Sequence, residues 1–175
     1  MLLGTRGDII LLGIDASMSS SGYSIVTQDK KVIKYGKINT NKEDFKDDVE
    51  RLTHICNTLE DIIKPYDIKL CILEDSIPVR NSKSVLQLNI LKGMIIRSLQ
   101  KNGIKTKLIY PTTVKKMVTG NGRATKEVIA QTVQKDLIDI GKYSDKQTKK
   151  QEKTSDIYDS LALVLAYLNK GRRKI

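Results

Sequence analysis

The sequence predicts an α/β fold: a mixed five-stranded sheet, three antiparallel strands followed by parallel ones, with helices on both faces. Two observations predict it. Three strand-like segments with short links open the chain, and after them the spacing of apolar residues becomes helical. From that point strand-like and helical segments alternate, which is the order that produces parallel strands connected by helices.

Five segments combine strand length with apolar or alternating character. They lie at 8–15, 21–28, 31–38, 68–74 and 105–110. The first and the fourth are almost continuously apolar, as expected for strands that helices cover on both faces. Because Gln28, Asp29 and Lys30 supply a short turn, we expect the first three strands to form an antiparallel meander.

Apolar residues at helical spacing predict the helices. The predicted segments are 45–63, about 84–101, a short helix from Pro111, about 125–138 and about 155–169. Pro65 stops the first of these, and Asn102 with Gly103 closes the second. A Gly-rich break at 120–122 separates the third from the fourth.

The composition favours a single domain over residues 1–175 with a phosphate-bearing partner. The chain has 175 residues, 39% of them hydrophobic, and 31 Lys and Arg against 20 Asp and Glu, for a formal charge of +11. Such a surplus indicates nucleic acid first and an anionic membrane surface second. No apolar stretch has the length of a membrane span, and the N-terminal residues are interpreted as a first strand rather than a signal peptide.

The two cysteines predict a reducing, cytoplasmic setting. Cys56 falls in a helical pattern and Cys71 in an apolar strand, so both are expected to be buried thiols. They form no CxxC pair, and the single His54 offers no partner for them. A zinc site is therefore not expected.

Four acidic residues stand at the predicted ends of elements. Asp15 ends the first strand, Glu74 ends the fourth, and Asp156 and Asp159 lie three apart at the start of the last helix. Taken singly, each has an ordinary explanation as a turn former, a cap or a complement to the positive helix end, and Asp75 is an alternative to Glu74. Gathered from three segments, however, carboxylates repel one another unless a cation lies among them.

This set of acids predicts a metal site. Two Mg²⁺ ions about 4 Å apart can activate a water, orient a phosphate and stabilise the departing 3′-oxygen. Mg²⁺ prefers near-octahedral oxygen ligation, which several carboxylates from different elements supply, and Mn²⁺ accepts the same ligands. We expect Asp15 to bridge both ions, with Glu74, Asp156 and Asp159 as further ligands. In so basic a chain, the prediction is a two-metal nuclease.

Basic residues cluster where a phosphate backbone could be held. Lys126 lies in the first turn of a predicted helix, where free N–H groups attract phosphate. The other candidates lie near the Gly-rich break or just after Glu74: Lys115, Lys116, Arg123, Arg80 and Lys83. The alternative is a plain helix–helix turn with solvated lysines. The lysine-rich stretch 141–153 is either a solvated linker or a further grip on a DNA backbone.

The segment LGIDASMSSSGYSIV resembles the first two strands of RuvC-type Holliday junction resolvases, which have an RNase H-like fold. The ending D156-I-Y-D159-S-L-A-L-V-L-A and the segment VKKMVTGNGRATK resemble two further family motifs, in the correct order. The resemblance maps the family's four acids onto Asp15, Glu74, Asp156 and Asp159, and it implies phosphate binding and catalytic support by Lys115 and Lys126. The chain looks most like the short RuvC-like endonucleases of lactococcal-type bacteriophages.

What the resemblance implies is a homodimer that binds four-way DNA junctions and nicks two strands symmetrically. The family's dimer contact involves the helix after Glu74, here 84–101, whose apolar density exceeds one buried stripe. The loop after Glu74 departs from the family, because it carries Ile77 and Pro78 where bacterial members have an aromatic wedge. We therefore expect activity on three-way junctions and forks as well as on four-way junctions.

Three alternatives remain at the level of sequence. A different RNase H-like nuclease would cut RNA or RNA–DNA hybrid and ignore junctions. A non-catalytic clamp would bind branched DNA without cutting it, although the four acids argue against that role. An ATPase lobe of the actin-like or sugar-kinase kind begins with a similar strand pair, but the chain is short for a second lobe.

Overall fold

The computed structural model describes residues 9–75, 83–141, 143–144 and 153–172. Its strands form one five-stranded sheet in the order β3-β2-β1-β4-β5. The strands are β1 (Ile10–Asp15), β2 (Ser20–Thr27), β3 (Val32–Asn39), β4 (Ile68–Glu74) and β5 (Lys105–Ile109). The β2 strand runs antiparallel to both β1 and β3, whereas β1, β4 and β5 are mutually parallel. The predicted mixed sheet is confirmed.

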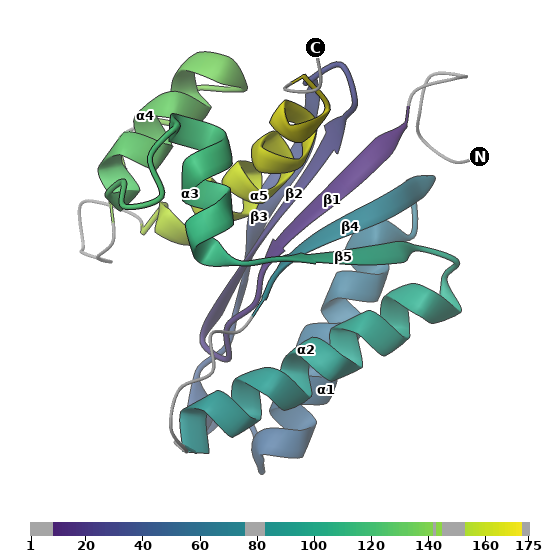
Figure 1. Ribbon diagram of the computed structural model, residues 1–175. Helices are drawn as coiled ribbons and strands as arrows, with labels where there is room; N and C mark the ends of the chain where they lie inside the picture. The colour runs from purple at the N-terminus through teal and green to yellow at the C-terminus, as the bar shows by residue number, and fades with distance from the viewer. Residues whose placement is uncertain (1–8, 76–82, 142, 145–152, 173–175) are drawn as a thin grey trace.

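The helices form two layers, one on each face of the sheet (Figure 1). They are α1 (Asp48–Ile63), α2 (Lys83–Lys101), α3 (Pro111–Thr119), α4 (Lys126–Asp136) and α5 (Ser155–Arg172), with a short 3-10 turn at Lys42–Asp44 before α1. One layer holds α1 and α2, and the other holds α3, α4 and α5. No helix in the described ranges is long and apolar enough to cross a membrane.

Each layer buries its own apolar core against the sheet. Alternate residues of a strand face opposite sides, so Leu12 and Ile14 pack with the α1–α2 layer while Leu11 packs with the α3–α5 layer. The same division on β4 puts Leu73 in the first core and Ile72 in the second. As expected, Cys56 and Cys71 are free and buried.

Local chemistry explains where the elements begin and end. Asp47 caps α1, because its carboxylate accepts a hydrogen bond from the backbone N–H of Glu50 at 2.8 Å. Tyr110, predicted as the last residue of the fifth strand, instead lies at the N-cap of α3. The next residue is Pro111, whose fixed φ and missing N–H suit the first turn of a helix.

Candidate active site

Two carboxylates meet at one edge of the sheet because their strands are parallel neighbours. Asp15 ends β1 and Glu74 ends β4, and the strands pair in a register that sets Ile14 beside Leu73. The two acids therefore follow that pair at the carboxyl ends of adjacent strands, where ligands bind in open α/β sheets. Glu74 lines the same cavity as Asp15. Asp75 instead donates its backbone N–H to the carbonyl of Ile109 at 2.9 Å.

The α5 helix brings its acids to this edge because glycines let it approach the strands closely. A Cβ atom built on Gly13 of β1 would lie 2.2 Å from the carbonyl oxygen of Ser160, and one on Gly22 of β2 would lie 1.9 Å from that of Asp156. Gly22 pairs directly with Asp15 across the strands. Any larger residue at either position would push the start of α5 away from Asp15.

A cavity of about 260 Å³ joins the strand ends to α3, α4 and α5. Its lining combines three carboxylates, two ammonium groups and four apolar side chains: Asp15, Glu74, Asp159, Lys115, Lys126, Pro111, Val114, Ile129 and Ala162. Asp156 does not line it. That residue lies about one turn earlier on α5 and is almost fully buried, at 6% exposure.

The pKa values of all three carboxylates in the cavity are raised, because burial disfavours their charged forms. Burial raises the pKa of Asp15 well above its usual range, and the charges of Asp159 and Glu74 raise it further. Burial and Asp159 also raise the pKa of Glu74, against the opposing effect of nearby lysines. The pKa of Asp159 is raised by burial too, although Lys126 counteracts it. Concentrated negative charge of this kind favours a cation.

Lysines form close ion pairs with both acids of α5. The ammonium of Lys126 lies 2.6 Å from Oδ2 of Asp159, and the ammonium of Lys153 lies 2.8 Å from Oδ1 of Asp156. Burial opposes the charge on Lys126, but Asp159 and Asp15 outweigh it and raise its pKa to about 12. For Asp156, hydrogen bonds from Lys153 and Ser20 outweigh burial and lower the pKa.

The donor set fits a hard divalent cation, although the side chains are not gathered around one point. In the described part of the chain, no three carboxylate, imidazole or thiol groups are arranged as a metal cage. Three observations nevertheless suit an ion: the donors are all oxygens, burial and mutual repulsion raise three of their pKa values, and Oδ2 of Asp156 is buried without a hydrogen-bond partner. A cation in the cavity would compete with Lys126 for Asp159, whereas Asp156 lies outside the cavity lining.

The other basic candidates divide into those in the cavity and those outside it. Lys115 and Lys126 line the cavity. Lys116, Arg123 and Lys83 are exposed and do not line the cavity. Arg80, together with Ile77 and Pro78 of the same loop, lies outside the described residues. In the stretch 141–153, the residues that the structure describes include Lys153, the partner of Asp156.

The sequence did not single out two lysines whose charges act on the acids, Lys153 and Lys92. Lys153 stood in a stretch without apolar pattern, and its partner became visible only in three dimensions. Lys92 is buried in α2, and its charge is coupled to Glu74, Asp15 and Asp75. A signal for it existed, since Lys92 interrupts the apolar stripe formed by Leu88, Leu91, Ile95 and Leu99.

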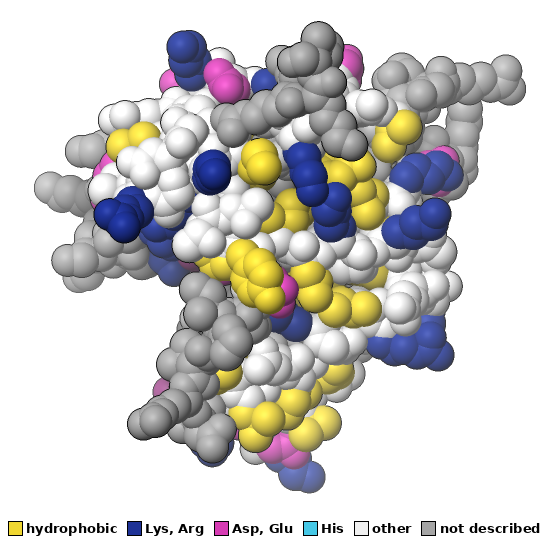
Figure 2. Space-filling model, in the orientation of Figure 1, with side chains coloured by type: hydrophobic (Ala, Val, Ile, Leu, Met, Phe, Trp, Pro, Cys, Tyr) yellow, Lys and Arg dark blue, Asp and Glu magenta, His cyan; other side chains and the backbone are white. Residues whose placement is uncertain are grey.

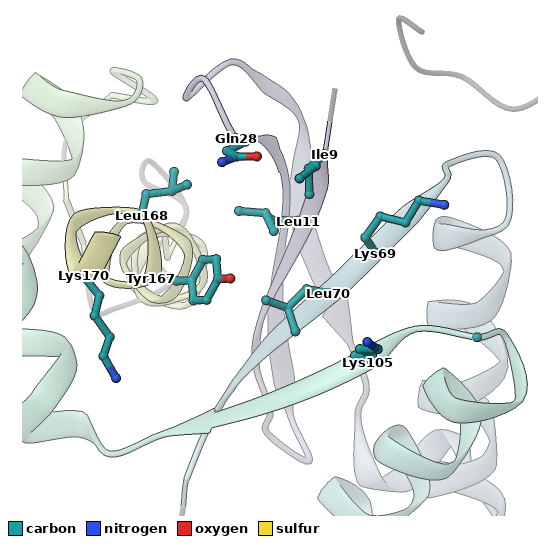
Figure 3. Close-up of a pocket in the computed structure, with 10 residues that line it drawn as sticks. Ile9, Leu11, Gln28, Lys69, Leu70, Lys105, Tyr167, Leu168 and Lys170 are labelled. Atoms are coloured by element: carbon teal, nitrogen blue, oxygen red, sulfur yellow. The ribbon is translucent and has the colours of Figure 1, made fainter. Parts of the chain in front are cut away.

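A larger cavity, about 780 Å³, lies away from these acids, toward the start of β1 (Figure 3). Its floor is apolar and its rim carries lysines from β4, β5 and α5. Tyr167 of α5 points into it, and the ammonium of Lys107 lies 5.1 Å from the centre of that ring. None of the predicted site residues belongs to its lining. The predicted acids therefore line the smaller of these two cavities.

Comparison with known proteins connects this site to a family. The family model described as "Crossover junction endodeoxyribonuclease RuvC" matches residues 11–167. A protein of that name from Rickettsia typhi is 34% identical over 122 residues, which is 69% of this chain and 78% of the relative. The protein of that name from Fusobacterium nucleatum is 29% identical over 162 residues, or 91% of this chain and 80% of the relative.

Solved structures agree on the fold. The chain is similar to RuvC from T. thermophilus in complex with Holliday junction substrate, with a TM-score of 0.75 and 16% identity over 95% of this chain and 96% of that one. It also resembles the yeast mitochondrial Holliday junction resolvase Ydc2, with a TM-score of 0.64 and 14% identity over 92% and 78% of the two chains. From the family match and the relatives together, the chain belongs to the RuvC family of crossover junction endodeoxyribonucleases.

Proposed function

We propose that this protein is a divalent-metal-dependent endonuclease that binds branched DNA as a homodimer and nicks its phosphodiester bonds. The observation that carries the proposal is the cavity at the sheet edge, which places Asp15, Glu74 and Asp159 beside Lys115 and Lys126. The family accounts for the reaction class, since RuvC relatives are structure-selective junction endonucleases. The charge of +11 suits a polyanionic substrate.

Nucleases of this family are metal-dependent. We propose Asp15, Glu74, Asp159 and Asp156 as the residues that hold Mg²⁺, two ions in each site, with Mn²⁺ as a substitute. The ions supply Lewis acidity and a bound water of lowered pKa. The acids of the chain would hold the ions in a fixed geometry. Two of these acids are positioned by parallel strands, and two by a helix whose backbone packs closely against glycines of the sheet.

The lysines of the cavity position the substrate. Lys126 pairs with Asp159 at 2.6 Å, and this pair must open when Asp159 takes a cation. The released ammonium is then available to a DNA phosphate at the N-terminal end of α4, where free backbone N–H groups also attract anions. Lys115 faces the same cavity from α3. Lys116, Arg123, Lys83 and Arg80 extend the phosphate contacts beyond it.

The α2 helix is the proposed dimer surface. Leu86 and Ile90 are 62% and 45% exposed on it, and they lie four residues apart, on one face of the helix. Figure 2 shows hydrophobic side chains gathered over α2, on a surface where lysines and arginines are otherwise frequent. A two-fold symmetric dimer presents two sites to a substrate of the same symmetry.

The substrate range is proposed to be broad: three-way junctions and replication forks in addition to four-way junctions. This expectation depends on the loop after Glu74, which carries Ile77 and Pro78 and no aromatic side chain. An apolar side chain can still wedge between bases but provides less stacking. The buried thiols fit action in a reducing cytoplasm.

The decisive test is cleavage of end-labelled four-way, three-way, forked and linear duplex DNA in Mg²⁺, with Asp15→Asn as the comparison. Paired nicks in branched DNA that disappear in the variant, while DNA binding persists, would establish the proposed activity. Cleavage of RNA–DNA hybrid with branched DNA left intact would assign a different nuclease. Tight binding without cleavage in Mg²⁺ or Mn²⁺ would leave a non-catalytic clamp.

A further inference from the structure

The larger cavity, about 780 Å³, lies over the amino-terminal ends of β1, β4 and β5. Its apolar floor belongs to the face of the sheet that carries α3, α4 and α5, because Leu11 and Leu70 pack with the core of that layer. Ile9, two residues before Leu11, lines the same cavity and is 45% exposed. From the last turns of α5, Tyr167 points into the cavity on the side of Leu11 and Leu70 (Figure 3). Part of the apolar core is therefore open to solvent here.

Ammonium groups from three elements stand at the rim of this floor. Lys69 of β4, Lys105 of β5 and Lys170 of α5 line the cavity and are exposed, and no Asp or Glu of the described residues lines it. Lys69 pairs with Asp67 at 2.6 Å. Within the part of the chain that the structure describes, Lys105 and Lys170 form no ion pair. The rim therefore carries positive charge that the described residues leave uncompensated.

The cavity has the composition and size of a binding site. An apolar centre inside a polar, charged rim is the usual anatomy of a protein–protein contact. Tyr167 adds an aromatic surface at the centre, and the ammonium of Lys107 lies 5.1 Å from the centre of its ring. The volume falls within the range of about 300–1,000 Å³ that binding pockets occupy. Exposed apolar surface with a polar rim of this kind marks a place where another molecule binds.

The distribution of charge decides which class of ligand fits. A DNA backbone presents phosphates and sugars, which would satisfy the lysines but leave the apolar floor in water. An apolar molecule with a single carboxylate would fill the floor but meet few of the ammonium groups that three elements hold around it. A peptide in which several carboxylates flank apolar side chains satisfies the floor and the rim together.

We propose that this cavity is the docking site for an acidic segment of a partner protein, in which apolar side chains alternate with carboxylates. The apolar side chains pack on Leu11, Leu70 and Tyr167, and the carboxylates pair with Lys105 and Lys170. Burial of apolar surface supplies most of the affinity, and the charges of the rim select against neutral and basic segments. This inference goes beyond the proposed function and does not depend on it, because no DNA takes part in the contact.

The docking site is far enough from the acids for a partner and DNA to bind together. Ile9 precedes β1 and Asp15 ends it, and a strand of that length spans about 20 Å. On α5, Tyr167 follows Asp159 by about 12 Å along the helix axis. The two cavities share no lining residue. A docked partner therefore leaves the catalytic cavity open.

The test is fluorescence anisotropy of three labelled hexapeptides with the full chain, in the absence of DNA. The peptide DLDFDL carries both features, DSDSDS keeps the carboxylates without the apolar side chains, and KLKFKL keeps the apolar side chains with the opposite charge. We expect DLDFDL to bind at least about tenfold more tightly than either control. Proton–nitrogen NMR spectra of the protein locate the peptide, and we expect shifts at Leu70 and Tyr167 and none at Asp15.

Charge reversal at the rim gives the matched comparison. Lys105→Glu and Lys170→Glu change exposed side chains, so both variants should fold, and each should weaken DLDFDL binding by about tenfold. Lys34→Glu changes an exposed lysine of β3 that does not line the cavity, and it should bind the peptide as the wild type does.

Several results would overturn the proposal. Equal binding of DLDFDL and DSDSDS would make the cavity a patch of positive charge open to any polyanion, DNA included. Absence of DLDFDL binding at millimolar concentration, or shifts outside the cavity, would remove the docking site. Tighter binding to a chain without residues 1–7 than to the full chain would make the chain's own N-terminal residues the occupant. Failure of the wild type to nick branched DNA would refute the proposed function alone, since peptide binding is measured without DNA.

Discussion

Individual carboxylates of the site work against the stability of the metal-free fold. The pKa values of Asp15, Glu74 and Asp159 are all raised. A carboxyl group whose pKa is higher in the folded chain binds more protons there than in the unfolded chain. Its folded form is therefore favoured at low pH, and this advantage is lost as the pH rises from about 4 through the raised pKa. At neutral pH the buried, mutually repelling carboxylates therefore destabilise the fold, and a bound cation would reduce this destabilisation.

Asp15→Asn is predicted to stabilise the metal-free protein while it abolishes nicking. Asparagine removes the buried charge that Asp159 and Glu74 repel. We expect Tm at pH 7 to rise, and in a chain of this size each kcal/mol gained raises Tm by about 2–4 °C. The gain should shrink toward pH 4, where the wild-type carboxyl is protonated as well. Differential scanning calorimetry from pH 4 to 8 measures it.

Added Mg²⁺ serves as the control for that experiment. It should raise the Tm of the wild type by mass action and raise that of Asp15→Asn much less. A variant less stable than wild type at pH 7 would contradict the electrostatic argument.

Lys126→Met is predicted to separate catalysis from stability. The ion pair of Lys126 with Asp159 is half exposed on the lysine side, so it contributes at most about 1 kcal/mol to folding. Loss of the ammonium group proposed to bind the scissile phosphate should lower kcat by about 10²–10³. Single-turnover nicking of a labelled junction checks this. Lys34→Met, which removes an exposed charge from the outer strand β3, should retain kcat within a few-fold and would reveal a general charge effect if it did not.

For single residues, the sequence predicts the position of charged side chains at the ends of strands and helices, but not of those whose position depends on tertiary packing. Asp15 and Glu74 could be predicted because each follows a buried strand, and parallel strands place such residues at one edge. The sequence did not predict that Asp156 lies outside the cavity. Its three-residue spacing from Asp159 predicts only that the two acids share a helix face, and it gives no sign of the ion pair between Asp156 and Lys153.

Among the elements, α5 depends most on a close approach to its neighbours. The backbone of this helix lies against Gly13 of β1 and Gly22 of β2 at distances that exclude a Cβ atom. The contact is with main-chain carbonyls of α5, which cannot move aside as a flexible side chain can. The position of Asp156 and Asp159 is therefore set by two residues that carry no side chain.

Gly13→Ala and Gly22→Ala are predicted to destabilise the fold and to displace α5. Overpacking of this kind typically costs about 1–3 kcal/mol, and both variants should lose nicking further than their stability explains. Gly93→Ala is the matched control: its added Cβ meets no atom within 4 Å, and α2 should gain about 0.5–1 kcal/mol from the better helix former. Urea unfolding of the three variants measures the order. Wild-type stability in Gly22→Ala would refute the close-approach argument.

Element types were predictable, but their limits were less so. The β5 strand ends one residue earlier than predicted, because Tyr110 adopts the N-cap position that Pro111 requires. Its apolar neighbours gave no hint of this. The α2 and α5 helices extend beyond the predicted limits to Lys83 and Arg172, and α5 does so although Gly171 lies in its last turn.

For the whole molecule, excess positive charge makes DNA affinity a function of salt. The observed binding constant should fall linearly with salt concentration on logarithmic axes. Lys116→Ala and Arg123→Ala should each lower the magnitude of that slope by about one and weaken all DNA shapes alike. Fluorescence anisotropy at several KCl concentrations measures the slopes. Lys34→Ala, on the outer strand β3, is the control and should leave the slope unchanged.

Assembly is predicted to depend on α2. Glutamates at Leu86 and Ile90 place charges in the proposed interface and should convert a dimer to monomers in sedimentation velocity, with loss of paired but not single nicks. Val128→Glu, on the exposed side of α4, should leave the mass unchanged. A wild-type monomer at micromolar concentration would contradict the proposed assembly.

Most of the architecture was accessible from sequence because its rules are local. Apolar periodicity distinguishes strands from helices, and three short links followed by helical crossovers specify antiparallel and then parallel pairing. Long-range packing was not accessible: nothing in the sequence shows that α5 crosses Gly13 and Gly22, or that Lys153 pairs with Asp156.

The order of the elements also has a consequence for synthesis. Asp15 is synthesised early, on β1, whereas Asp159 follows on α5, the last helix in the described part of the chain. The cavity that both acids line can therefore form only after α5 has been made and has packed against β1 and β2. A chain that ends before α5 lacks Asp159 and the helix that closes one side of the cavity.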